Sequence, residues 1–78
     1  MNLDKANESA YRLESWTKTL LAHIQKDLPI ARAILQGTDA VPPGATKESL
    51  AAAHLWEIER ATRDLNEALK DLKKAIAA

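Results

Sequence analysis

The chain has 78 residues, which is enough for one domain of two or three helices and too few for a second domain. Its 11 basic and 11 acidic residues cancel, so no overall charge is available to hold a long nucleic acid or an anionic membrane. Cysteine is absent, which excludes disulfides and thiolate metal sites. Phe is also absent, and Ala, Leu, Lys and Glu dominate, a composition that predicts an all-α fold.

Neither a signal peptide nor a membrane span is expected. The N-terminal stretch MNLDKANESAY has no apolar core region, and no apolar run approaches the length that crosses a bilayer. We therefore expect a soluble cytoplasmic protein with no membrane partner.

The first predicted helix covers residues 3–36 and is interrupted near residues 27–29. Pro29 lacks the N–H that would bond the carbonyl of Gln25, so we expect a kink, or a break at which Asp27 caps a short second helix. Gly37 follows as a helix-ending residue and opens a predicted loop over residues 37–45, which contains two prolines. The helix is amphipathic because apolar residues recur at alternating spacings of three and four: Leu3, Ala6, Ala10, Leu13, Leu20, Ile24, Ala31 and Ile34.

The second predicted helix covers residues 46–76, with Thr46 as N-cap and Glu48 in the first turn. Its apolar surface is wide and contains a row of small residues, Ala61, Ala68 and Ala75, that lets another helix approach closely. Two further rows lie beside it: Ala51, Ile58, Leu65 and Leu72, and then Leu55, Leu69 and Ile76.

These elements predict a single helical-hairpin domain over residues 1–78, with the two helices antiparallel. A hairpin covers only one side of each helix and buries little apolar surface for its size. We therefore expect hairpins to assemble into a helical-bundle homo-oligomer.

No residue pattern indicates catalysis, a metal or a cofactor. The two histidines, His23 and His54, form no HExxH motif and no pair four residues apart, and no nucleophile or phosphate-loop motif is present. His54 falls on the inward side of the second helix, where a hydrogen-bonded histidine is the usual occurrence. The sequence favours a non-catalytic binding protein that uses no metal and no cofactor.

Trp56 points about 160° away from Ile58 by the helical period, so its ring is directed away from the buried row. One interpretation is that the ring anchors another subunit or packs on the prolines of the loop. The other is that Trp56, with Arg60 and Arg63 one and two turns on, binds a flat anionic ligand. Tryptophan stacks on bases, and arginine forks onto phosphate oxygens.

Tyr11 raises the same question on the first helix, where Lys18 and Lys26 follow it along the polar flank. A solvated helix face with one amphipathic tyrosine explains this pattern. An aromatic platform followed by lysines is also what a nucleotide site on a helical surface needs.

The loop ending in VPPGAT and the stretch LAAAHLW resemble the small helical phage proteins that sequester cyclic oligonucleotide signals of the bacterial CBASS defence. That family has a proline-containing lead-in to a helix that begins roughly Thr-Lys-Leu-Glu-Glu-Ala-x-Met-Trp, and Leu50, Ala53 and Trp56 fall on its Leu, Ala and Trp. The resemblance covers about twenty residues of mostly generic amphipathic helix. Other positions depart from the pattern: Glu48, Ser49, Ala51, Ala52 and Leu55.

The resemblance implies an anti-defence sponge in the host cytoplasm, an oligomer that binds cyclic di- or trinucleotides between subunits without chemistry. In that family an aromatic residue of the first helix stacks on a base and a later lysine contacts phosphate, roles that Tyr11 and Lys26 would fill. By shape the chain is also similar to the helical-hairpin chaperones of type III secretion. The alternative function is accordingly a small adaptor, chaperone or inhibitor that binds a protein partner through an apolar helix face.

Overall fold

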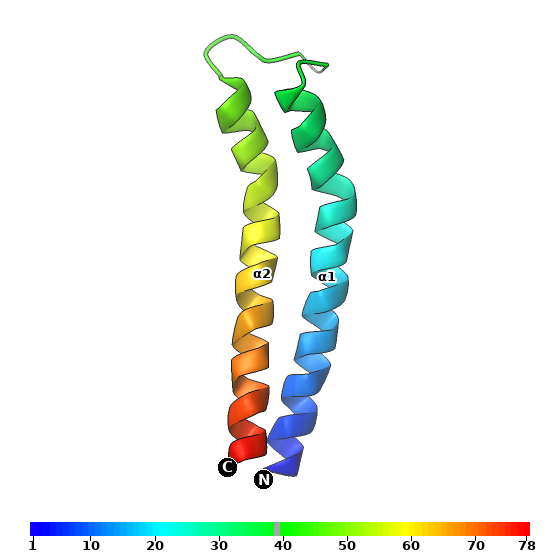
Figure 1. Ribbon diagram of the computed structural model, residues 1–78, viewed down its shortest axis with the longest axis vertical. Coiled ribbons are helices and arrows are strands. Elements are labelled where there is room, and N and C mark those ends of the chain that lie inside the picture. Colours follow the sequence, from blue (N-terminus) through cyan, green and yellow to red (C-terminus); the bar gives the residue numbers. More distant parts are fainter. Residues whose placement is uncertain (39) are drawn as a thin grey trace.

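The computed structural model describes residues 1–38 and 40–78 as two long antiparallel helices (Figure 1). Helix α1 spans Leu3–Leu35 and helix α2 spans Lys47–Ala77. The two termini lie together at one end of a rod whose Cα extents are 55 × 18 × 14 Å. The predicted all-α hairpin is confirmed, and each helix boundary lies within one residue of the predicted one. Asp39, part of the predicted loop, lies outside the described residues.

Local sequence signals fix the helix ends that flank the loop. Gly37 has a positive φ of +77°. Its N–H donates to the carbonyl of Ile34, and the N–H of Thr38 donates to the carbonyl of Ala33. These two bonds form a Schellman motif at the end of α1. At the start of α2, the Thr46 hydroxyl accepts the N–H of Ser49, and the Ser49 hydroxyl accepts the N–H of Thr46. The predicted roles of Gly37 and Thr46 are therefore confirmed.

Small side chains line the contact between the helices. Ala61, Ala68 and Ala75 of α2 are buried, as the row of small residues predicts. The backbones come close enough at the open end for the N–H of Asn2 to donate to the carbonyl of Ala75 at 3.0 Å. No large side chain of the described residues is fully buried. Most of the buried apolar residues are alanines: Ala6, Ala31, Ile34, Ala51, Ala61, Ala68 and Ala75.

The first helix does not break at Pro29, so of the kink or break expected near residues 27–29 the break is excluded. Helix α1 continues through this proline to Leu35. The carbonyl of Gln25 loses its helical partner because Pro29 has no N–H. Both Gln25 and Pro29 are exposed, so water can take the place of that partner. Contacts with α2 hold the helix on both sides of it: buried Asp27 before the proline pairs with His54, and Ala31 and Ile34 after it are buried against Ala51. Asp27 is consequently no cap but a buried residue in the middle of the helix.

Candidate functional site

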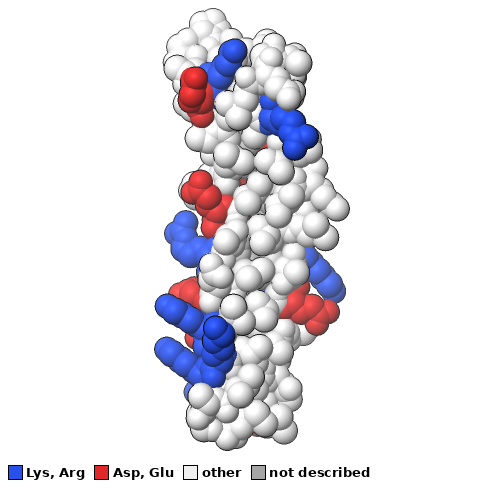
Figure 2. Space-filling view, in the orientation of Figure 1, with Lys and Arg blue, Asp and Glu red and all other residues white. Residues whose placement is uncertain are grey.

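One long side of the hairpin is apolar, and we call it the apolar face. Residues seven apart share a side of a helix, so Leu21, Leu28 and Leu35 form a row on α1, and Leu55, Leu69 and Ile76 form one on α2. Figure 2 shows this face as a largely uncharged surface that runs the length of the rod, with charges along its edges. All these side chains except the half-buried Leu55 are exposed. Such an extended exposed apolar surface is typical of a binding surface.

Both rows lie on the same side of the hairpin, opposite the side on which Arg12 of α1 pairs with Asp71 of α2. The Arg12 guanidinium lies 3.2 Å from the Asp71 carboxylate. Leu21 follows Arg12 by nine residues, or about two and a half turns, and so points the opposite way. Leu69 lies about 160° around α2 from Asp71 by the same count. The hairpin as a whole is therefore amphipathic.

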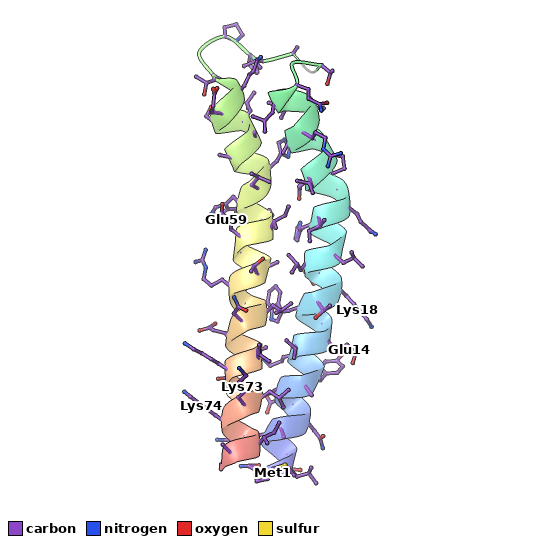
Figure 3. All side chains as sticks on the ribbon, viewed as in Figure 1. Met1, Glu14, Lys18, Glu59, Lys73 and Lys74 are labelled. Atoms are coloured by element: carbon purple, nitrogen blue, oxygen red, sulfur yellow. The ribbon has the colours of Figure 1, made fainter. Side chains whose placement is uncertain are left out.

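Charged residues border the apolar face (Figures 2 and 3). On α1, Glu14 lies in the seven-residue row of Leu21 and forms an exposed pair with Lys18 at 3.5 Å. On α2, Glu59 and Lys73 lie along the border fourteen residues apart. Each helix therefore brings both signs of charge to the border of the face.

A polar cluster interrupts the contact between the helices. Asp27 lies between two histidines: its Oδ2 is 3.2 Å from Nδ1 of His23, and its Oδ1 is 3.4 Å from Nδ1 of His54. Nε2 of His23 lies 3.8 Å from Oε2 of Glu57. The inward, hydrogen-bonded position expected for His54 is confirmed. A polar group placed among apolar contacts favours the one register in which it finds its partners, so this cluster specifies how α1 pairs with α2.

The charge of Asp27 depends on these neighbours. Burial by itself raises the pKa of the Asp27 carboxyl, but hydrogen bonds with His54 and His23 and the positive charge of Lys26 outweigh burial and lower the pKa below its usual value. Asp27 is therefore ionised in the fold. Sequence reasoning assigned Asp27 to a cap, although its place in the seven-residue row with Leu20 and Ile34 indicated an inward position.

Within residues 1–38 and 40–78, no group of three or more His, Asp or Glu side chains is arranged to hold a metal ion. The histidine nitrogens of the polar cluster instead face carboxylates.

Trp56 keeps the outward position that the helical period predicts, with 51% of its surface exposed. The Arg60 guanidinium lies over its ring, 5.6 Å from the ring centroid, in a cation–π contact. Arg63 is exposed one turn further along. These three predicted ligand residues therefore form one group on the outer surface of α2.

Tyr11, Lys18 and Lys26 are all exposed on α1. Tyr11 and Lys18, two turns apart, form a second group, whereas Lys26 lies fifteen residues from Tyr11, roughly 20 Å along the axis. The Arg12–Asp71 pair places Tyr11 near the level of Asp71, fifteen residues from Trp56, which is roughly 20 Å along the axis. A single hairpin therefore does not bring the two groups of predicted ligand residues into one pocket.

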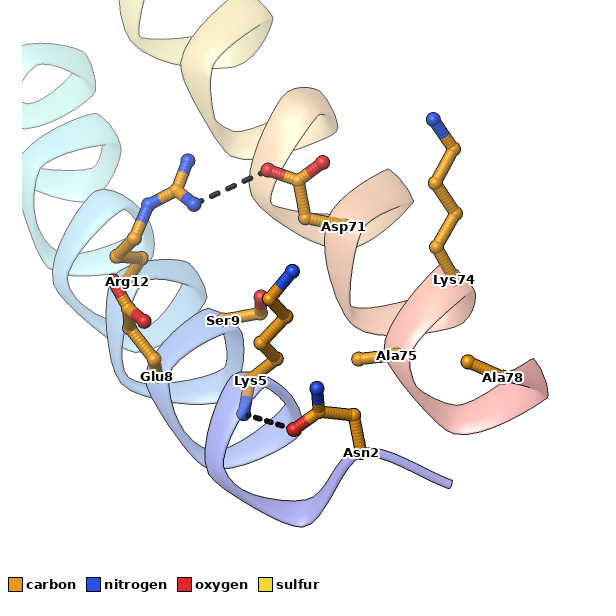
Figure 4. Close-up of a pocket in the computed structure, with 9 residues that line it drawn as sticks. All are labelled: Asn2, Lys5, Glu8, Ser9, Arg12, Asp71, Lys74, Ala75 and Ala78. Atoms are coloured by element: carbon orange, nitrogen blue, oxygen red, sulfur yellow. Dashed lines mark hydrogen bonds and ion pairs between the residues drawn. The ribbon is translucent and has the colours of Figure 1, made fainter.

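A shallow groove with a cavity volume of about 420 Å³ lies at the open end of the hairpin (Figure 4). Lys5, Arg12 and Lys74 line it together with the acids Glu8 and Asp71. Because Arg12 already pairs with Asp71, the groove presents mixed charge and no dominant sign. The sequence patterns did not predict this groove, since it is formed by opposite ends of the chain.

Comparisons with protein-family models, with curated proteins and with solved structures find no match to this chain. Across the part of the chain that the structure describes, neither helix combines the length and the apolar character needed to cross a membrane.

Proposed function

We propose that this chain is a non-catalytic binding protein that assembles through its apolar face into a homo-oligomer of helical hairpins. The observation that carries the proposal is the apolar face itself, which exposes large aliphatic side chains on both helices along the length of the rod.

The hairpin interior leaves this apolar surface without a partner. The side chains buried between the helices are mostly alanines, whereas the larger Leu21, Leu35 and Ile76 remain more than half exposed. Complete burial of one large aliphatic side chain stabilises a protein by about 1.5–3 kcal/mol relative to full exposure. Association that buries several of these aliphatic side chains adds their contributions to the stability of the assembly. Their sum is large compared with the stability of so small a domain.

A cyclic di- or trinucleotide is the second element of the proposal, and the Trp56–Arg60 contact supports it. An exposed indole ring stacks on a base, and arginines neutralise phosphate. Arg63 adds a second guanidinium on the same side of the helix. Tyr11 with Lys18 or Lys26 supplies a second platform and a second cation, and an oligomer rather than one hairpin would unite the two groups. Binding would sequester the nucleotide without converting it.

Two measurements on the purified chain test the proposal. Sedimentation at micromolar concentration should give a mass above that of one chain, and a stable folded monomer would contradict the oligomer. Calorimetric titration against a panel of cyclic di- and trinucleotides should show binding that weakens with salt, since phosphate contacts are screened. If every nucleotide fails to bind, the rival function is an adaptor, chaperone or inhibitor that binds a protein helix on an apolar surface with little salt dependence.

Trp56→Ala separates the two roles of the ring. If the ring stacks on a nucleotide, the variant keeps its helicity and oligomer size and loses roughly 1–3 kcal/mol of binding free energy. If the ring anchors the oligomer, the variant dissociates or melts early. Glu67→Ala, an exposed position of α2 away from the apolar face, is the matched control and should bind the nucleotide normally.

A further inference from the structure

We propose that the occupant of the apolar face is a second copy of this chain, stacked face to face and antiparallel, with the two loops at opposite ends of the dimer. The inference rests on the proposed homo-oligomer and specifies its geometry. In this arrangement α1 lies against α1 of the second copy and α2 against α2 of the second copy. The two-fold axis crosses the apolar face near the level of Thr17.

Two threonines make the middle of the face suitable for burial. The hydroxyl of Thr17 donates to the carbonyl of Leu13 at 2.8 Å, and that of Thr62 donates to the carbonyl of Ile58 at 2.8 Å. Because both hydroxyls are satisfied within their own helix, covering them leaves no donor unpaired. The contacts between α1 and α2 place the two threonines within about one turn of the same level. The two threonines therefore add no unsatisfied hydroxyl to the centre of the face.

The charges at the α2 edge fix the direction of stacking. Glu59 and Lys73 are fourteen residues apart, about 21 Å along the helix, so they do not meet within one chain. They lie nearly symmetrically about Leu65–Asn66, the part of α2 that faces the level of Thr17. Figure 3 labels both residues on the single chain. A two-fold axis at this level would bring Glu59 of each copy close to Lys73 of the other.

The α1 edge agrees with the same axis. Glu14 and Lys18 lie on either side of the level of Trp16–Thr17, so each acid comes within about one turn of the lysine of the second copy. With both loops at the same end instead, α2 lies against α1 of the second copy, so Glu59 and Lys73 do not come together. The antiparallel arrangement is thus the one that pairs these two charges.

The area of contact is sufficient for a stable dimer. With the axis near Thr17, about 27 residues of α1 overlap, a length of roughly 40 Å. Over the 18 Å width of the hairpin this gives roughly 700 Å² per copy and 1,400 Å² in total, within the range of specific interfaces. The ends of the overlap bring Leu28 near Leu3 of the second copy, and Leu55 near Ile76 of the second copy. The exposed Leu3, Leu28 and Ile76 are thereby covered, whereas Leu35 lies beyond the overlap.

Cysteine cross-linking tests the arrangement, because the native chain has no cysteine. Thr17→Cys, placed close to the two-fold axis, should form a disulfide-linked dimer under mild oxidation with unchanged helicity. Leu3→Cys is the matched control, since its two copies would be roughly 40 Å apart and should stay unlinked. If instead the dimer links through a mixture of Leu3→Cys and Ile76→Cys chains and not through Thr17→Cys, the antiparallel geometry is overturned while the proposed oligomer stands. A folded monomer at all concentrations would overturn both.

A charge exchange gives a second test that leaves the apolar face unchanged. Glu59→Lys should weaken the dimer by roughly two- to thirtyfold, because two symmetric exposed ion pairs are lost. The double variant Glu59→Lys with Lys73→Glu should restore the affinity of the native chain. Since these two positions are about four turns apart in one helix, restoration reports a contact between copies. Equal affinity for the native chain and the single variant would overturn the proposed pairing.

Discussion

Replacing Ala68 by leucine should destabilise the hairpin, although leucine is the more hydrophobic residue. Ala68 is completely buried in the row of small residues, and at one end of that row the backbones approach closely enough to form the Asn2–Ala75 hydrogen bond. Three further carbon atoms cannot enter this contact unless the helices separate. Overpacking of this kind costs about 1–3 kcal/mol. For a domain of this size the loss corresponds to a melting temperature lower by roughly 5–25 °C.

The assay is thermal unfolding followed by circular dichroism, at one fixed chain concentration because association would make the midpoint concentration-dependent. Ala53→Leu is the matched control, since it makes the same chemical change at an exposed position of α2. The control should melt within a few degrees of the native chain. Equal midpoints for the native chain and both variants, or a higher one for Ala68→Leu, would refute the argument that small residues set the approach of the helices.

Three further predictions concern α1. Ile34→Ala should lower the free energy of unfolding by about 2–5 kcal/mol, because Ile34 is the largest of the buried apolar residues. Denaturant unfolding measures this loss, and an unchanged midpoint would contradict the core position of Ile34. Pro29→Ala should stabilise the helix by up to about 3 kcal/mol, since Pro29 is exposed inside α1, whereas Pro43→Ala in the loop should change the melting temperature little. Asp27→Asn should reduce the acid sensitivity of the fold. Because the folded-state pKa of Asp27 lies below 3.8, its ionised form contributes fully above about pH 4, and that contribution is lost as the pH falls through the folded-state value. The melting temperatures of the native chain and the Asp27→Asn variant should therefore converge below about pH 4, and a constant difference would show that ionised Asp27 adds no stability.

The sequence alone determined the helices and their ends. The Thr46 cap and the Gly37 ending involve partners within five residues, so the local pattern was sufficient to predict them. The burial of Ala61, Ala68 and Ala75 followed from helical periodicity for the same reason.

Only the tertiary structure decided which residues of α1 lie beside which residues of α2. Of the kink or break expected at Pro29, the break does not occur, because the local rule took no account of the contacts with α2 before and after the proline. The role of Asp27 depends on His54, twenty-seven residues away, and the separation of Tyr11 from Trp56 depends on the same register. The two leucine-rich rows could each be recognised in the sequence, yet their union into one apolar face required the relative rotation of the helices. Side chains distant in sequence, above all the polar cluster around Asp27, set that rotation through contacts that helical periodicity does not encode.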